Sequence, residues 1–391
     1  MLPLEDVTVV TVEQAVAGPL ATRHLADLGA RVIKIERPGT GDFARHYDDA
    51  VHGLSSHFVW LNRSKESISV DLKHEEGKRI LEKLVARSDI FLENLGPDAI
   101  ERLGFSAKHL RTQHPRLITC EISGYGSSGP FRHRKAYDLL IQAESGLLSI
   151  TGTEASPSRV GISVADIAAG IYAYSGILAA LLKRQKTDEG SHVEVSLLEA
   201  LGEWMGYPVY YAGYGGMELR RAGTHHATIA PYGDVPTDDG LVFIGIQNDA
   251  EWRRFCDKVL GQPELGGDTR FATNRSRVEH RERLLEIIGG VFSPMTTAEA
   301  MERLAEAGIA HAQVNSVLDF IAHPQLAARN RWREIDSPVG KLSALLPPAE
   351  IEGVEPRMGR VPDLGEHNRA ILSALGYDEA TIRRLREEGV I

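Results

Sequence analysis

The sequence predicts an α/β fold with a parallel sheet, together with a smaller α+β domain in the middle of the chain. Short apolar strands alternate with helical segments over the first half of the chain, which is typical of βαβ units. The first unit runs from a strand at 7–12, through a helix at 20–28 that ends at Gly29, to a strand at 31–35. With 391 residues, the chain is long enough for two or three domains with substantial cores.

The remaining elements follow the same alternation up to about residue 210. Strands are predicted at 65–72, 89–92, 117–122 and 192–196, and helices at 74–87, 99–103, 138–150 and 197–205. A Tyr- and Gly-rich stretch at 211–216 is interpreted as a linker. Beyond it, a strand at 241–246, helices at 249–260 and 278–292, and a capping box from Thr296 to Glu299 predict the smaller domain.

These patterns divide the chain into three ranges. Residues 1–210 form the large domain, 217–320 the small domain, and 321–391 a C-terminal segment. The last segment has too little apolar sequence for a core of its own, so we expect it to return to the large domain.

Composition and charge limit the classes of function. A net charge of −10 argues against a nucleic-acid-binding protein, which would carry a basic surface. The two cysteines are far apart and form no metal-ligand spacing, so we expect no metal site and a reducing compartment. The N-terminus enters a strand directly, without the pattern of a signal peptide. We therefore expect a cytoplasmic protein with no nucleic-acid or membrane partner.

Polar side chains gather where the predicted parallel strands end. Ligands of such sheets lie beyond the carboxyl ends of the strands, so the loops after 35, 92 and 122 are expected to face one crevice. That crevice would hold Arg37, Lys73, Asn94, Arg102, Lys135 and Tyr137. Each alone could be a solvated surface residue. Four cations in an acidic protein nevertheless indicate a polyanionic ligand, such as a nucleotide with several phosphates. A dinucleotide is disfavoured, because the turn at 17–20 lacks G-x-G-x-x-G and Pro19 has no amide hydrogen.

The segment from Ser163 to Gln185 is the least ordinary part of the sequence. Between Ile167 and Leu182 it has no charge, and its small residues cover every helical face, which predicts a buried helix. It is too short and too rich in Gly and Ser for a confident membrane span. Asp166 stands where this helix is expected to begin. The position suits a helix N-cap, and it equally suits an ionised carboxylate that acts as a nucleophile.

A series of short motifs, in one order along the whole chain, resembles a known family. The motifs are Ala17-Gly18-Pro19, 28–37, Gly41-Asp42, 70–73, 93–97, 124–126, the Asp166 segment, 190–195 and 364–368. Together they are similar to the class III CoA-transferases, the family of formyl-CoA transferase and carnitine CoA-transferase, with α-methylacyl-CoA racemase as a sister. The resemblance implies a Rossmann-like large domain built from both ends of the chain, a small middle domain and an interlocked homodimer.

The resemblance also implies which residues act. The aspartate nucleophile of the family falls on Asp166, which would form an aspartyl anhydride and then an aspartyl-CoA thioester. Acyl-CoA is thus expected as a substrate, with no permanently bound cofactor. The implied CoA contacts are Val16, Ala17, Arg37, Val70, Lys73, Asn94, Leu95, Gly96, Arg102, Lys135 and Tyr137.

Two departures from formyl-CoA transferase bear on the substrate. Val16 replaces a glutamine, and 221–231 lacks the glycine-run loop, so oxalate and formate are disfavoured. The 41–47 motif instead looks like members that act on C4–C5 dicarboxylates such as itaconate, citramalate, malate or mesaconate, with succinyl-CoA as donor. A second substrate carboxylate needs a cationic or hydrogen-bonding clamp. Arg45, His46, His225 and His226 are the candidates.

Two alternatives stay open at this point. The racemase pairs its aspartate with a histidine of a Gly-His-Asp segment, whereas this chain has Tyr137 at the histidine position, before Asp138. A tyrosine, with a pKa near ~10, is a poor partner for proton exchange at neutral pH, which favours the transferase. A non-catalytic CoA-binding module is the other alternative.

Overall fold

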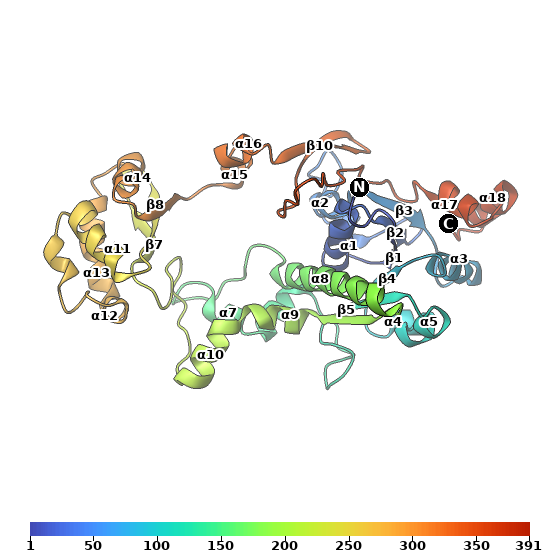
Figure 1. The fold of residues 1–391 in the computed structure, drawn as a ribbon, viewed down its shortest axis with the longest axis horizontal. Helices are drawn as coiled ribbons and strands as arrows, with labels where there is room; N and C mark the ends of the chain where they lie inside the picture. The colour runs from blue at the N-terminus through green and yellow to red at the C-terminus, as the bar shows by residue number, and fades with distance from the viewer. The chain divides into compact units, whose positions relative to one another are not determined.

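The computed structural model describes residues 1–391, which form two compact units (Figure 1). The larger unit contains Met1–Ser145, Val160–Gly206 and Leu326–Ile391, so it is built from both ends of the chain. The smaller unit contains Gly146–Arg159 and Tyr207–Gln325. The stretch 146–159 lies inside the predicted range 1–210 but belongs to the smaller unit.

A parallel sheet of six strands forms the centre of the larger unit, which confirms the predicted α/β class. The strands are β1 (Thr8–Val12), β2 (Arg31–Glu36), β3 (Lys65–Ser69), β4 (Ile90–Glu93), β5 (Ile118–Ser123) and β6 (His192–Ser196). Their order across the sheet is β3-β2-β1-β4-β5-β6, with every neighbouring pair parallel. Strand order reverses between β1 and β4. Open α/β sheets bind ligands at such a reversal, outside the carboxyl ends of the strands.

Helices cover both faces of the sheet. On one face lie α3 (Glu75–Val85), α5 (Ala107–Gln113), α17 (Asn368–Ala374) and α18 (Glu379–Glu387), whose apolar side chains join Val10, Ile33 and Phe91 in one core. The C-terminal helices thus complete the core of the N-terminal strands. On the other face lies α1 (Ala17–Asp27), which packs along α8 (Val164–Thr187). Helix α8 also packs on β5 and β6.

Shorter elements complete the larger unit. They are a 3₁₀ turn (Phe43–His46), α2 (Ser56–Asn62), α4 (Ala99–Arg102), α6 (Asp138–Glu144), α9 (Leu197–Trp204) and the hairpin β10 (Trp332–Ser337) with β11 (Gly340–Leu345). The predicted helix at 138–150 is in fact α6 followed by α7 (Leu147–Ile150). Gly146 separates the two, because it takes a left-handed conformation with φ of 83°.

The smaller unit has an antiparallel sheet of β7 (Tyr232–Pro236), β8 (Leu241–Gly245) and β9 (Ala310–Gln313). Its helices are α11 (Asp249–Arg254) with a π-helical continuation (Phe255–Leu260), α12 (Asn274–Glu279), α13 (Arg281–Phe292), α14 (Thr297–Glu306) and α15 (Val317–Ile321). A 3₁₀ turn (Pro263–Gly266) and α16 (Pro324–Ala328) complete the assignment. The capping box from Thr296 to Glu299 is confirmed. The predicted linker at 211–216 was wrong, since these residues belong largely to α10 (Gly206–Gly215).

Helix α8 is the one helix that is long and apolar enough to cross a membrane, judged by length and composition alone. Half of its most apolar stretch is buried inside the protein, against α1 and the sheet. The prediction of a helix buried on all sides was too strong, because Ser175, Ala179 and Leu182 are exposed. These three residues share one face of the helix, opposite the face that packs on α1.

Candidate active site at the carboxyl edge of the sheet

The predicted crevice residues do lie at the carboxyl edge of the sheet. Arg37 follows β2, Lys73 follows β3, Arg102 ends α4 and Lys135 lies in the loop after β5. All four cations are exposed, and none forms an ion pair with a carboxylate. Arg102 donates only to the Pro97 carbonyl, at 3.1 Å. Unpaired cations on adjoining loops favour a polyanionic ligand there.

Asn94 joins the two loops at the reversal of strand order. Its Oδ1 accepts from the Gln14 amide at 2.7 Å, and its Nδ2 donates to the Gln14 carbonyl at 2.9 Å. A Cβ on Gly18 would lie 3.1 Å from the Asn94 side chain, so a larger residue there would have to displace Asn94 by a few tenths of an ångström. The Asn94 amide therefore holds the crevice together, rather than pointing freely at a ligand.

Four of the other predicted CoA contacts offer the ligand little side-chain surface. Val16 packs with Leu20, Leu61, Ile167 and Ile171, and Val70 is part of the large core. Ala17 is buried and Leu95 is half-buried against the same core. The remaining two predicted contacts, Gly96 and Tyr137, are exposed. Contacts of Val16, Ala17 and Val70 with a ligand would have to use the backbone.

Close packing of α8 against α1 places Asp166 near the loop between β1 and α1, at the carboxyl edge of the sheet. A Cβ on Gly170 would lie 2.7 Å from the Ala17 carbonyl oxygen, so the two helices approach most closely where α1 begins. Asp166 lies one turn earlier on the same face of α8 as Gly170. Its neighbours Ile167 and Ile171 pack against Ala15 and Val16. Asp166 thereby lies in the turn of α8 that faces the start of α1.

Asp166 is not the cap of its helix, in contrast to the prediction. Helix α8 begins at Val164, and Asp166 is the third residue of its first turn. Asp138 accepts from the amides of Ala165 at 2.7 Å and Asp166 at 3.3 Å, and thus takes the capping role from another helix. Burial, and then the negative charge of Asp138, raise the pKa of Asp166 to about 7. The helix terminus therefore does not keep this carboxylate fully ionised, as the sequence suggested, because burial and a like charge outweigh it.

Tyr47 is a neighbour of Asp166 that the sequence analysis missed. Burial raises the pKa of its phenol to about 12, with further contributions from the charges of Asp42 and Asp166 and from Tyr137. Its ring meets His57 edge-on, with 5.2 Å between the ring centroids. Tyr47 follows the 3₁₀ turn after β2, so the 41–47 motif does reach the surroundings of Asp166.

A buried network of charges supports the loop between β1 and α1. Lys65 donates to Glu13 at 2.7 Å, and Lys34 donates to Asp42 at 2.7 Å. Asp42 in turn accepts from the Ala15 amide at 3.0 Å. Burial opposes the charge on Glu13, but Lys65 and Lys34 outweigh it and lower the pKa of Glu13 to about 2. Lys34, which stands between the apolar residues Ile33 and Ile35 of β2, was the signal for this network in the sequence.

Two of the predicted substrate residues are held by internal contacts. Arg45 forms a bidentate ion pair with Glu36, with both bonds at 2.7 Å, and its guanidinium stacks 3.6 Å from the Phe58 ring. Nε2 of His46 lies 2.9 Å from the Thr40 carbonyl oxygen. In this state, Arg45 has its carboxylate partner within the protein.

The other two candidates, His225 and His226, lie in the smaller unit. His226 stacks between Tyr207 and Tyr232, and its backbone carbonyl accepts from Arg281 at 2.6 Å. Burial, and then the charge of Arg281, lower the pKa of His226. His225 lies 3.6 Å from Asp234 and lines a tightly packed pocket that has no room for a water molecule.

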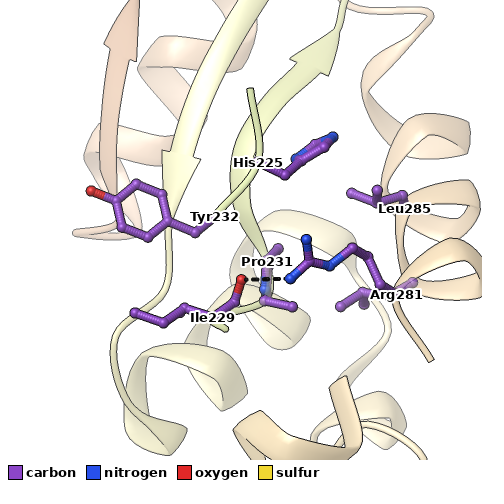
Figure 2. Close-up of a pocket in the computed structure, with 8 residues that line it drawn as sticks. His225, Ile229, Pro231, Tyr232, Arg281 and Leu285 are labelled. Carbon is purple, nitrogen blue, oxygen red and sulfur yellow. Dashed lines mark hydrogen bonds between the residues drawn. The ribbon is translucent and has the colours of Figure 1, made fainter. Parts of the chain in front are cut away.

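Figure 2 shows this pocket, with Arg281 bonded to the Ile229 carbonyl at its base. The remaining walls are Ala230, Pro231, Tyr232, Leu284 and Leu285. Together, these contacts hold the 225–232 segment against α13 and β7. No group of three or more His, Cys, Asp or Glu side chains anywhere in the chain could hold a metal ion.

Comparison with known proteins gives one consistent result. The model of CoA-transferase family III matches residues 4–368. Succinyl-CoA:glutarate CoA-transferase of Mus musculus is 37% identical over 396 residues, which cover 100% of this chain and 91% of that protein. Succinyl-CoA–D-citramalate CoA-transferase of Chloroflexus aurantiacus is 32% identical over 404 residues, which cover 100% of this chain and 98% of that protein. A CaiB/BaiF family protein of Brucella suis has a similar crystal structure, with a TM-score of 0.84 and 31% identity, covering 96% of this chain and 99% of that one.

Proposed function

Because the chain belongs to CoA-transferase family III, we propose that it moves coenzyme A from succinyl-CoA to a C4–C5 dicarboxylic acid. CoA thioesters are the substrates of such an enzyme, and no permanently bound cofactor is needed. The observation that carries the proposal is the carboxylate of Asp166, a residue that lies near the loop between β1 and α1 and whose pKa only burial and Asp138 determine. With no donor to neutralise it, this carboxylate is available to attack a carbonyl carbon.

The reaction proceeds by four exchanges at carbonyl carbons. The Asp166 carboxylate attacks the thioester of succinyl-CoA, the C–S bond breaks, and a mixed anhydride and CoA thiolate result. The thiolate attacks the aspartyl carbonyl, which releases succinate and leaves an aspartyl-CoA thioester. The acceptor carboxylate then displaces CoA to form a second anhydride. Finally, the thiolate attacks the acceptor's carbonyl and regenerates the Asp166 carboxylate.

No proton is gained or lost in this cycle, so the site needs no general acid. It needs a carboxylate that is ionised, positioned and partly desolvated. A pKa of about 7 makes the ionised form of Asp166 more basic, and therefore more nucleophilic, than an ordinary aspartate. As a consequence, Asp166 is protonated, and so not nucleophilic, in a fraction of the molecules at neutral pH.

CoA binding is assigned in this proposal to the exposed cations Arg37, Lys73, Arg102 and Lys135. Their positions in the connections that follow β2, β3, β4 and β5, at one edge of the sheet, match the several phosphate charges of coenzyme A. The hydrogen bonds of Asn94 and its close contact with Gly18 hold the loops after β1 and β4 together. Val16, Ala17, Val70, Leu95 and Gly96 supply backbone and packing, and Tyr137 supplies an exposed ring.

For the acceptor, we propose a five-carbon dicarboxylate, with glutarate and citramalate first. Two relatives that align over the full chain are named as glutarate and citramalate CoA-transferases. The 41–47 motif was likewise interpreted as typical of members that act on C4–C5 dicarboxylates. The direct test is incubation of the purified protein with succinyl-CoA and single acids, with new acyl-CoA species detected by mass. Glutarate, citramalate, itaconate, malate and mesaconate form the panel, butyrate is the acceptor with a single carboxylate, and oxalate and formate are the controls. Transfer to oxalate with none to the C4–C5 dicarboxylates would overturn the assignment.

The clamp for the second carboxylate is tested with the same assay. Arg45, His46, His225 and His226 are each replaced by alanine, and glutarate is compared with butyrate, which has only one carboxylate. Loss of a clamp raises KM for glutarate several-fold and leaves KM for butyrate unchanged, because only the dicarboxylate uses the second contact. Because Arg45 is bonded to Glu36, its replacement is expected to change both acceptors alike, through the loop it supports.

We further propose an interlocked homodimer. Large apolar side chains stay exposed in the single chain, among them Leu182, Trp204, Tyr210 and Tyr214, and such exposure is typical of surfaces that bind another protein. Light scattering coupled to size-exclusion chromatography tests this directly. A mass of one chain at micromolar concentration would contradict it.

A further inference from the structure

The carboxylate of Asp138 reaches the N-terminus of α8 from a different helix. Asp138 is the first residue of α6, and its Oδ1 accepts from the Ala165 amide at 2.7 Å and from the Asp166 amide at 3.3 Å. The N-cap residue of α8, Ser163, makes no side-chain hydrogen bond to the first turn. Asp138 therefore provides the missing cap.

The second oxygen of Asp138 is also held in place. Gln142, which is fully buried, donates to Oδ2 of Asp138 at 2.7 Å. The same amide group donates weakly to the Ile162 carbonyl at 3.5 Å, and its oxygen accepts from the Val160 amide at 3.0 Å. Gln142 thus fixes Asp138 and, with it, the chain that leads into α8. Such double anchoring of one carboxylate leaves it a single orientation.

Two carboxylates consequently share one helix terminus. Asp138 takes the free amides, and Asp166 is left with the repulsion of a neighbouring negative charge. We propose that Asp138 is a positioning residue for the nucleophile: it caps α8 in place of Asp166, leaves the Asp166 carboxylate free of the helix amides, and places a second negative charge beside it. This role rests on the proposed function of Asp166 as nucleophile.

Asp138 is the one charged side chain that contributes to the raised pKa of Asp166. The elements packed against α8 bring Arg23, His24 and Asp27 from α1, Glu199 and Glu203 from α9, Glu121 from β5, and His192 and Glu194 from β6. None of them alters the titration of Asp166, whereas Asp138 does. The phenol of Tyr47 is also close, but it is uncharged at neutral pH.

The test replaces the charge of Asp138 while keeping an oxygen for the cap. Asp138→Asn keeps a side-chain oxygen that reaches the α8 amides and removes the negative charge, whereas Asp138→Ser removes the charge and is too short to keep the cap. The matched control is Asp378→Asn at the start of α18, where Asp378 accepts from the Thr381 amide at 2.8 Å. It makes the same chemical change at another helix terminus, away from the site. Thermal unfolding confirms that each variant is folded.

The readout is the titration of Asp166 itself. In the wild type, kcat/KM is expected to rise with pH through about 7, since the ionised carboxylate is the nucleophile. In Asp138→Asn and Asp138→Ser, the midpoint moves down by about one pH unit, which makes ionised Asp166 about tenfold more abundant relative to the protonated form at acid pH. In Asp378→Asn, the midpoint stays where it was.

A second measurement does not depend on turnover. Carbon-13 NMR of aspartate-labelled protein, with Asp166→Asn to assign the resonance, follows the same carboxylate directly. An unchanged Asp166 midpoint in a folded Asp138 variant overturns the positioning role, whether or not the protein transfers CoA. If the NMR midpoint moves but the wild type transfers CoA to no acid, the coupling stands and the role of Asp166 as nucleophile fails.

Discussion

Asp166 combines two properties that pull in opposite directions. In the proposed mechanism, its burial and its negatively charged neighbour increase its nucleophilicity once it is ionised, and the same two features disfavour ionisation. An aspartate on an exposed helix terminus would be fully ionised at neutral pH but far less reactive. The residue is therefore expected to lower the stability of the fold in return for its reactivity.

This cost gives a stability prediction. The pKa of Asp166 is raised from 3.8 to about 7 in the folded chain, so the folded state binds the proton more tightly than the unfolded state. Its contribution to stability is fully present below about pH 4 and is lost as pH rises through 7. Asp166→Asn should therefore unfold at higher urea than the wild type at pH 8, by about 1–2 kcal/mol after allowance for partial exposure, and differ little at pH 4.5.

The control for this prediction is again Asp378→Asn. The Thr381 amide and hydroxyl hold the pKa of Asp378 below its ordinary value, so this replacement is expected to lose stability at neutral pH, not gain it. Equal urea midpoints for wild type and Asp166→Asn at pH 8 would be evidence against a raised pKa.

At the scale of elements, the buried charges Glu13, Lys34, Asp42 and Lys65 hold the loop between β1 and α1 against β2 and β3. Each charge has an opposite partner, and Glu13 also accepts from Thr22 of α1 at 2.7 Å. Removing one partner leaves the other charge buried and uncompensated, whereas removing both is tolerated better.

Lys65→Met is accordingly predicted to lower the free energy of unfolding by about 3–5 kcal/mol, because Glu13 is left without its closest cation. The double variant Lys65→Met with Glu13→Gln should recover much of this loss. Urea unfolding of the two single variants and the double variant forms the cycle that checks it. Strictly additive losses would mean that the two charges do not interact.

The elements also show what the sequence can and cannot predict. Five of the six parallel strands were predicted within about two residues, because their apolar runs are short and bounded by turns, and β3 was predicted three residues too long. Helix α2 was missed because its seven residues are too few to show a helical period, and β10 because polar residues surround its apolar ones. Helix α10 was taken for a linker because of its glycines.

The site was predictable to a similar degree. Strand ends and motifs pointed to the crevice and to Asp166. The capping by Asp138 was not predictable, because it depends on a tertiary contact between α6 and α8 that no local pattern encodes. The pairing of Arg45 with Glu36 was hidden for the same reason.

At the scale of the whole molecule, an acidic chain presents four unpaired cations along one sheet edge. Their replacement by alanine, one at a time at Arg37, Lys73, Arg102 and Lys135, is predicted to raise KM for succinyl-CoA by about tenfold each with little change in kcat, which is the effect of losing one charge-assisted contact. The increase should shrink as ionic strength rises, because salt screens exposed charges. Steady-state kinetics at two salt concentrations measures both effects.

Lys186→Ala is the control for these variants, since Lys186 is an exposed cation at the far end of α8. It is expected to leave KM unchanged. A tenfold rise there as well would mean that the overall charge of the protein, and not the crevice, attracts the substrate.

The central claim is that Asp166 forms a covalent bond with CoA during transfer. The protein is mixed with succinyl-CoA, without an acceptor, quenched in acid and digested, and the peptide containing Asp166 is analysed by mass spectrometry. We predict an adduct of one CoA less one water on Asp166, which disappears when glutarate is added before the quench and is absent from Asp166→Ala. A CoA adduct on another residue, or transfer that persists in folded Asp166→Ala, would contradict the account.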